Sequence, residues 1–189
     1  EELNRIEKFQ IPDNHAALGP VHDIFLFCCY TGLRYSDVRN LTWEDLHNGK
    51  MEVVTIKTND LLVIELNNKA NELISKYKDI HFKGNVVFPV IANQNMNDAL
   101  HLLFKLAGFN EPIKQVYYQG NQRKEIVTPR YKLIGTHTGR RTFICLALSK
   151  GIPPSVVMKW TGHSDYKAMK PYIDISDDVK EEYMKKFDE

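Results

Sequence analysis

The sequence predicts a mainly α-helical fold with small β-hairpins, which places the chain in the α+β class. Apolar residues recur at helical spacing in most long segments, and two pairs of β-branched runs each flank a short polar turn. The 189 residues include 43% hydrophobic and 26% charged residues, a balance typical of a soluble globular protein with one buried core. No apolar run approaches the ~20 residues that cross a bilayer, so we expect no membrane association.

The first part of the chain is expected to carry an arginine in a turn between two helices. Residues 21–30 are apolar on most sides, which is typical of a buried helix. Gly32 follows in the position where helices commonly end. Ser36 is expected to cap a second short helix over residues 36–41. Arg34 is therefore predicted to lie in the turn, with the backbone fixed on both sides.

A first β-hairpin is predicted after these helices. Residues 51–57 and 61–66 are rich in β-branched side chains and flank the turn-forming sequence Thr58-Asn59-Asp60. Lys57 lies at the end of the first strand, next to the tip. The same kind of periodicity indicates further elements: helices over residues 2–8, 67–77 and 95–107, and a short extended piece over residues 85–88.

A second hairpin opens a strongly basic part of the chain. Residues 113–118 and 125–128 flank a Gln-Gly-Asn-Gln turn. The net charge of the chain is only +1, but residues 112–172 contain 11 Lys/Arg and 2 Asp/Glu, a balance of +9. Such a patch is typical of polyanion binding, so Arg123 and Lys124 are expected to lie over DNA. Charge alone leaves open the alternative of a solvated surface with uneven charge.

Three helices are expected in the last part of the chain. Thr136 is expected to cap a helix over residues 137–150. The dipeptide Pro153-Pro154 fits the first turn of the next helix, where proline is tolerated. Residues 165–172 are expected to be helical again, although this segment contains a proline.

Five side chains from two distant segments suit one reaction, the attack of a phenol on a phosphodiester. They are Arg34, His137, Arg140, His163 and Tyr172. Two guanidinium groups can grip the non-bridging oxygens with paired hydrogen bonds that lysine cannot imitate. A tyrosine near pH 7 is mostly protonated and must be activated as it attacks.

The proton transfers of this reaction also have candidates. His137 could take or position the phenolic proton, because imidazole titrates close to working pH. His163 could hold another phosphate oxygen, and Lys57 could protonate the departing 5′ oxygen. The product would be a 3′-phosphotyrosyl enzyme that keeps the bond energy, so we expect no ATP, metal or other cofactor. The three cysteines lack metal-ligand spacing, which indicates buried thiols in a reducing compartment.

Each of these residues, taken singly, also has an ordinary structural interpretation. Arg34 fits a surface arginine, His137 a contact at a helix end, and His163 an exposed loop histidine. Lys57 beside a turn fits a solvated side chain, and Tyr172 is one of nine tyrosines that could pack in a core. Only the joint pattern favours chemistry on a phosphodiester.

The joint pattern resembles the catalytic domain of the tyrosine recombinases, the phage integrase family, over residues 21–172. It is most similar to integrases of bacterial mobile elements. The stretch TGLRYSDVRNLTWEDL resembles the first arginine box of the family, with Arg34 followed by the acidic Asp37. HTGRRTF resembles the second box, and TGHSDYKAMKPY resembles the family's histidine and nucleophile at the family's spacing. Lys57 sits where the hairpin lysine of the family is found.

The resemblance implies a tyrosine recombinase catalytic-domain fold and a site-specific recombinase or integrase. Such an enzyme cleaves and rejoins double-stranded DNA through a 3′-phosphotyrosyl intermediate, assembles as a tetramer on DNA, and works in the bacterial cytoplasm at the nucleoid. Residues 1–175 are expected to form the catalytic domain. Residues 176–189 are expected to form a helical tail, which docks on its own domain or passes to a neighbouring protomer. The family's N-terminal DNA-clamping domain is absent from the sequence, so we expect a fragment with weak DNA binding.

Two residues depart from the pattern of the family. Gly139 stands where leucine is common, and it is expected to cost the helix roughly 1 kcal/mol relative to alanine. Arg141 stands where a histidine is common, and it offers a second candidate for the arginine of the box. The His-x-x-Arg spacing favours Arg140, and Arg141 is then expected to contact DNA.

Two other functions remain as alternatives. A type IB topoisomerase shares the chemistry, but the short spacing between the boxes and the acidic C-terminal tail favour recombination. A non-catalytic DNA-binding regulator could use a helix-turn-helix around Gly151 and bind phosphates with the basic segment. A regulator without catalytic activity would not need Arg34, His137, Arg140, His163 and Tyr172 together.

Overall fold

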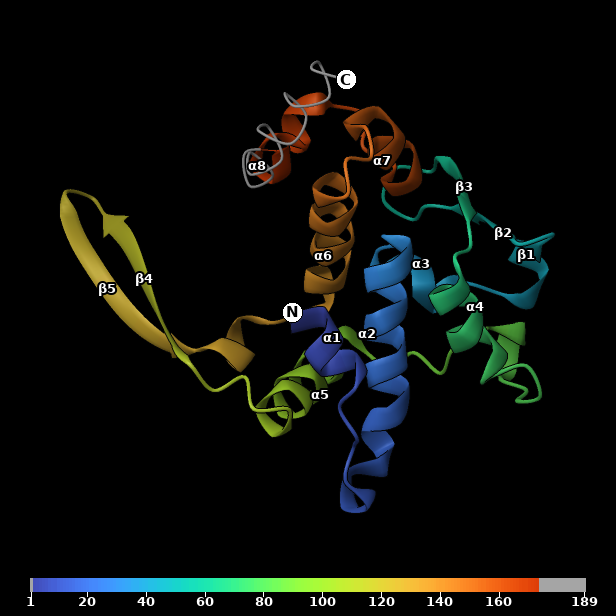
Figure 1. The fold of residues 1–189 in the computed structure, drawn as a ribbon, viewed down its shortest axis with the longest axis horizontal. Helices are drawn as coiled ribbons and strands as arrows, with labels where there is room; N and C mark the ends of the chain where they lie inside the picture. The colour runs from blue at the N-terminus through green and yellow to red at the C-terminus, as the bar shows by residue number, and fades with distance from the viewer. Residues whose placement is uncertain (1, 174–189) are drawn as a thin grey trace, which may run out of the picture.

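Two long helices form the centre of the molecule. The computed structural model describes residues 2–173, and in it α2 (Gly19–Thr31) runs beside α6 (Thr136–Ser149) (Figure 1). The other helices surround this pair, namely α1 (Glu2–Glu7), α3 (Tyr35–Asn40), α4 (Asn68–Ser75), the equally long α5 (Asn93–Leu106), α7 (Pro154–Thr161) and α8 (Lys170–Ile173). Short 3-10 segments lie between the helices and strands, η1 (Asp13–Leu18), η2 (Trp43–Asp45), η3 (Lys83–Asn85), η4 (Arg130–Leu133) and η5 (Tyr166–Ala168). The prediction of a mainly helical fold is confirmed.

Helix α2 is buried on nearly all sides, as its continuous apolar sequence predicts. Phe25 makes an edge-to-face contact with Phe104 of α5 at 5.0 Å between ring centroids. Phe27 lies 4.9 Å from the ring of Phe88, in the segment before α5. These aromatic contacts fix the helices that surround α2 and make it the spine of the larger hydrophobic core.

The first hairpin belongs to a three-stranded antiparallel sheet. Strands β2 (Lys50–Val54) and β3 (Leu61–Glu65) pair as predicted, and the short strand β1 (Leu46–His47) adds to β2. Side chains alternate strictly between buried and exposed along β2 and β3. Strand β1 was not predicted, because two residues are too few to show alternation.

The second hairpin projects from the body of the protein. Strands β4 (Pro112–Gln119) and β5 (Gln122–Pro129) pair along their full length, and Figure 1 shows them extending away from the helices. Neither strand contains a buried residue. The hairpin therefore was predicted correctly from turn chemistry and β-propensity, although it contributes nothing to the core.

Several predicted helix ends were wrong. Helix α3 begins at Tyr35, so Ser36 lies inside it and does not cap it. Helix α6 begins at Thr136 itself; Gly135 precedes it and donates its N–H to the hydroxyl of Thr138 at 3.0 Å. The predicted helix over residues 165–172 is instead a 3-10 turn, η5, followed by the short α8, because the proline tolerates only a first-turn position.

A second, smaller core lies at the C-terminal end of α6. Ile144 and Leu148 of α6 pack there against Val157 of α7 and Met169, and Tyr172 packs against this cluster from α8. The expected tail over residues 176–189, with its apolar stripe, lies outside the described residues. The boundary predicted at residue 175 is therefore not tested.

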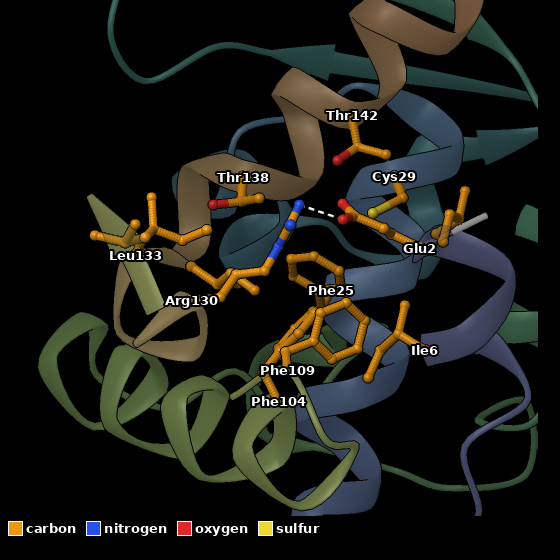
Figure 2. A pocket seen from close by; sticks show the side chains of 13 residues that line it. Glu2, Ile6, Phe25, Cys29, Phe104, Phe109, Arg130, Leu133, Thr138 and Thr142 are labelled. Atoms are coloured by element: carbon orange, nitrogen blue, oxygen red, sulfur yellow. Dashed lines mark ion pairs between the residues drawn. The ribbon is translucent and has the colours of Figure 1, made fainter. Parts of the chain in front are cut away.

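Two cavities flank α1. One has a volume of about 310 Å³ between α1, α2, α5 and α6, and the ion pair between Glu2 and Arg130 lies beside it (Figure 2). Thr138 and Thr142 line it from α6 (Figure 2). The other is a groove of about 590 Å³ that runs between α1, β3, α6 and α7 and is lined mainly by apolar side chains.

Candidate catalytic site

Arg140 is held at the centre of the site by backbone carbonyl groups. It lies in the second turn of α6 and is 1% exposed. Its Nη1 donates to the carbonyl oxygen of Gly32 at 2.9 Å, and its Nη2 donates to that of Thr161 at 2.5 Å. A buried guanidinium is tolerated because its donors are satisfied. The arginine thereby joins the end of α2 to the end of α7.

Two glycines allow this geometry. Gly32 has φ of 73°, a left-handed conformation that ends α2, and its carbonyl accepts from Arg140. A Cβ on Gly139 would lie 2.8 Å from the Cβ of Cys28 and 3.0 Å from the carbonyl oxygen of Phe25. The residue that departs from the family's leucine is thus required here by the close approach of α6 to α2.

His163 contacts Arg140 and is oriented by Thr161. The Thr161 hydroxyl donates its single hydrogen to the carbonyl oxygen of Val157 at 2.6 Å, so it accepts at 2.7 Å from Nδ1 of His163. These partners assign the proton to Nδ1, which leaves Nε2 as an acceptor 3.3 Å from Nη2 of Arg140. In this state His163 positions the arginine.

Positive charge is concentrated at the site. Burial, followed by the charges of Arg140 and Arg34, lowers the pKa of His163 to about 4. Burial and the same two arginines, together with Arg141 and Lys57, lower the pKa of His137. Both imidazoles are therefore neutral at pH 7. Burial and Arg34 lower the pKa of Arg140 to about 10. A bound phosphate would relieve this mutual repulsion.

Arg34 pairs with a carboxylate that also holds the first hairpin. Arg34 precedes α3, and its Nη1 lies 3.7 Å from Oδ2 of Asp37, whose side chain is fully buried. Both atoms are buried without a hydrogen-bond partner within the described chain. The other oxygen, Oδ1 of Asp37, accepts from the backbone N–H of Ile56 at 3.1 Å. Asp37 therefore connects the arginine to the residue before Lys57.

Lys57 lies exposed on the turn between β2 and β3. Thr55 closes the turn: its N–H donates to the carbonyl of Asp60, its carbonyl accepts from the N–H of Asn59 and its hydroxyl accepts from the N–H of Asp60. The positive charge of Lys57 is close enough to His137 to lower the pKa of that histidine. The turn thus brings the lysine to the edge of the cluster.

Tyr172 reaches the site from α8. Its N–H donates to the carbonyl oxygen of Met169 at 2.9 Å, and its half-buried ring packs on the smaller core. The phenol lies near enough to Arg140 to influence the pKa of the arginine. The structure therefore gathers all six residues proposed for the chemistry into one region, with His137 and Lys57 exposed and Arg140 buried.

The three residues expected to bind DNA lie on two elements, α6 and β5. Arg141 is exposed next to His137 on α6. Arg123 and Lys124 lie on β5, and as neighbours in a strand they point to opposite faces of the hairpin. Arg123 forms an ion pair with Glu125 at 2.7 Å. The expectation that Arg123 and Lys124 lie over DNA stays a prediction.

Two supporting contacts of the site were not predicted from the sequence. Thr161 supplies both a carbonyl to Arg140 and a hydroxyl to His163, and its place two residues before the histidine is the only signal that the sequence carries. The hydrogen bond from the backbone N–H of Ile56 to Asp37 could not be predicted from the sequence, because every residue except proline has a backbone N–H.

Residues 2–173 lack the features of a metal site and of a membrane span. No group of three or more His, Cys, Asp or Glu side chains gathers there with the geometry of a metal site. No helix in that range has both the length and the apolar character needed to span a bilayer.

Comparison with protein families gives one match, which covers most of the chain. The profile of the phage integrase family matches residues 4–178. A comparison with curated protein sequences finds no match.

Three solved structures illustrate the similarity of fold. The XerA recombinase aligns with a TM-score of 0.66 at 14% identity, over 98% of this chain and 63% of its own. A XerH site-specific recombinase, in a post-cleavage complex with a palindromic difH substrate, aligns with a TM-score of 0.65 at 16% identity, over 99% of this chain and 50% of its own. The lambda integrase catalytic core aligns with a TM-score of 0.59 at 17% identity, over 87% of this chain and 90% of its own. The chain thus spans half to two thirds of the two recombinases and nearly all of the catalytic core.

Proposed function

The chain belongs to the phage integrase family, and we propose that it is the catalytic domain of a site-specific recombinase that cleaves and rejoins double-stranded DNA. The observation that carries the proposal is the cluster of cationic and imidazole groups around Arg140, with one phenol beside it. A site with this much positive charge and two neutral imidazoles suits a phosphodiester.

The proposed reaction is a transesterification that begins at Tyr172. Its phenolic oxygen attacks the phosphorus, a bond forms between them, and the bond from phosphorus to the 5′ oxygen breaks. The phenolic proton passes to His137, whose lowered pKa keeps it neutral and able to accept. Lys57 donates a proton to the departing 5′ oxygen. One phosphoester replaces another, so the second half of the reaction can reverse these steps with a new strand.

Different groups orient the two arginines of the site. Arg34 and Arg140 bind the non-bridging oxygens, where negative charge builds up in the transition state. Arg140 is preorganised by two carbonyls and by His163. Arg34 is oriented by Asp37. His163 supports Arg140 in the state described; to donate to a phosphate oxygen from Nε2, its ring would have to gain a proton there.

A covalent trapping assay tests this proposal. Nicked DNA duplexes that lose a short product strand after cleavage should trap the protein covalently on DNA. The Tyr172→Phe variant should fold and bind DNA but form no covalent adduct. Tyr166→Phe is the matched control, because that tyrosine is 56% exposed and lies six residues upstream. An adduct that persists in Tyr172→Phe would assign the nucleophile to another tyrosine. If neither protein forms an adduct on any duplex, the proposed function is wrong.

We also propose that the domain assembles as a tetramer on DNA. The cleavage of two duplexes and the exchange of their strands require four nucleophiles, and the chain has one Tyr172. The similar XerH recombinase is bound to a palindromic substrate, and a palindromic site suits a symmetric assembly of reading subunits.

A further inference from the structure

The hairpin β4–β5 is an exposed ribbon whose two faces differ. Residues that face each other across an antiparallel pair share a side, and neighbours along a strand alternate. The register pairs Gln115 with Ile126, Tyr117 with Lys124, and Gln119 with Gln122. We call this set the amide face. The remaining set, called here the ion-pair face, consists of Lys114, Val116, Tyr118, Arg123, Glu125 and Val127.

The charges of the ion-pair face are occupied with one another. Glu125 accepts from Lys114 at 2.5 Å and from Arg123 at 2.7 Å. Each cation that could meet a polyanion from this side is therefore already paired with the single carboxylate of the hairpin. Tyr118 is 70% exposed and Val127 62% exposed beside them.

The amide face has no acidic residue. It presents three exposed glutamines and Lys124, whose ammonium donates to the side-chain carbonyl of Gln119. Ile126 lies 48% exposed opposite Gln115, and Tyr117 is 49% exposed opposite Lys124. Donors, acceptors and small apolar surfaces therefore alternate along one side of a two-stranded ribbon.

We propose that the amide face of this ribbon reads base edges in the major groove of the DNA on which the domain acts. The major groove admits a two-stranded β-ribbon, and eight residues per strand extend over roughly 27 Å. Glutamine can pair with an adenine through two hydrogen bonds, lysine can contact guanine, and an apolar side chain can contact the methyl group of thymine. The net charge of the ribbon, with three Lys/Arg and one Glu, favours an anionic partner such as DNA over a basic protein surface.

The position of the ribbon in the chain supports this partner. β5 ends at Pro129, and only η4 and two residues separate it from α6, which carries His137 and Arg140. A short, ordered segment therefore links any contact between the ribbon and DNA to the candidate catalytic residues of α6. The proposal rests on the proposed function, because it assumes that DNA lies over the cationic site.

Selection from a random DNA library tests the proposal. The 189-residue chain, in a Tyr172→Phe background that prevents cleavage, is incubated at low salt with duplexes that carry a randomised stretch of about 12 base pairs. The bound pool is sequenced and compared with the input pool. Gln115→Ala and Gln122→Ala test the amide face, and Val116→Ala and Val127→Ala are the matched controls on the ion-pair face. All four side chains are exposed, and thermal unfolding verifies that each variant folds.

We expect the unmodified amide face to enrich particular bases, and each glutamine variant to lose about tenfold in preference at one or two positions. The valine variants should keep the full pattern. A pattern that is unchanged by both glutamine variants, or that changes only with the valine variants, would overturn the proposal, as would the absence of any enrichment. The covalent trapping assay decides the proposed function separately, because it depends on Tyr172 and needs no preferred sequence.

Discussion

Arg140 shows how a single buried charge can organise a site. Its two carbonyl partners come from residues more than 100 positions and 21 positions away in the chain. A lysine at this position could not contact both carbonyls and a phosphate at the same time, because it has one nitrogen where arginine has a planar fork. The identity of the residue therefore matters as much as its charge.

The lowered pKa values of the histidines predict a pH-dependent stability. An unfolded histidine has a pKa near 6.5, whereas the pKa of His163 in the folded state is about 4. Folding also lowers the pKa of His137 and that of His22. The unfolded state therefore binds more protons between these values, so the free energy of unfolding should fall as pH falls from 6.5 toward 4.5.

Urea unfolding at pH 7.5, 6.0 and 5.0 measures this dependence. We expect His163→Asn to lose part of the decrease, because it removes one of the groups that the folded state keeps neutral. His81→Asn is the control, since that histidine is exposed and far from the site in sequence. An identical decrease in all three proteins would show that His163 does not contribute.

At the scale of elements, the packing of α6 on α2 depends on Gly139. A methyl group there meets Cys28 and the backbone of Phe25 at distances that real Cβ atoms avoid, so the helices must move apart. We expect Gly139→Ala to lower the free energy of unfolding by about 1–3 kcal/mol, although alanine is the better helix former. Gly19→Ala is the control, because nothing lies within 4 Å of its added Cβ. Equal stability of the two variants, measured by urea unfolding, would contradict this account.

Lys57, on the turn between β2 and β3, can be tested directly for its proposed role as the proton donor. If Lys57 protonates the departing oxygen, a substrate with sulfur at the scissile 5′ position should need little protonation. Such a substrate should restore single-turnover cleavage in Lys57→Ala and leave Arg140→Ala slow, because the arginine stabilises charge on other oxygens. Lys50→Ala is the control, because Lys50 lies at the other end of β2 and pairs with Glu65. Equal failure of the Lys57 and Arg140 variants would remove Lys57 from the role of acid.

At the scale of the whole molecule, the tail after Ile175 is expected to govern assembly. Val179, Tyr183 and Phe187 are spaced as one apolar stripe of a helix, and a helix of about 12 residues would be marginal alone, so we expect the stripe to dock. The apolar groove beside α6 and α7, lined by Phe143, Leu146 and Trp160, offers a surface of matching character.

Truncation after Ile175 should leave a folded domain that still binds DNA but loses cooperative assembly and strand exchange. Sedimentation on DNA and recombination assays measure both, with the complete 189-residue chain as reference. Val179→Asp tests the stripe with a single change. Unchanged assembly together with unchanged recombination would show that the tail only packs on its own domain.

The sequence by itself determined the main helices and both hairpins, and it supplied the set of residues proposed for the chemistry. Continuous apolar runs, turn residues and motif spacing are local signals, so α2, the turn at Arg34 and the His-x-x-Arg of α6 were predictable. Only the tertiary structure decided which charges are buried, which imidazole nitrogen carries a proton, and that Asp37 links Arg34 to the hairpin of Lys57. These properties arise from contacts between distant segments, and backbone N–H and C=O groups, which every sequence carries, supply most of them.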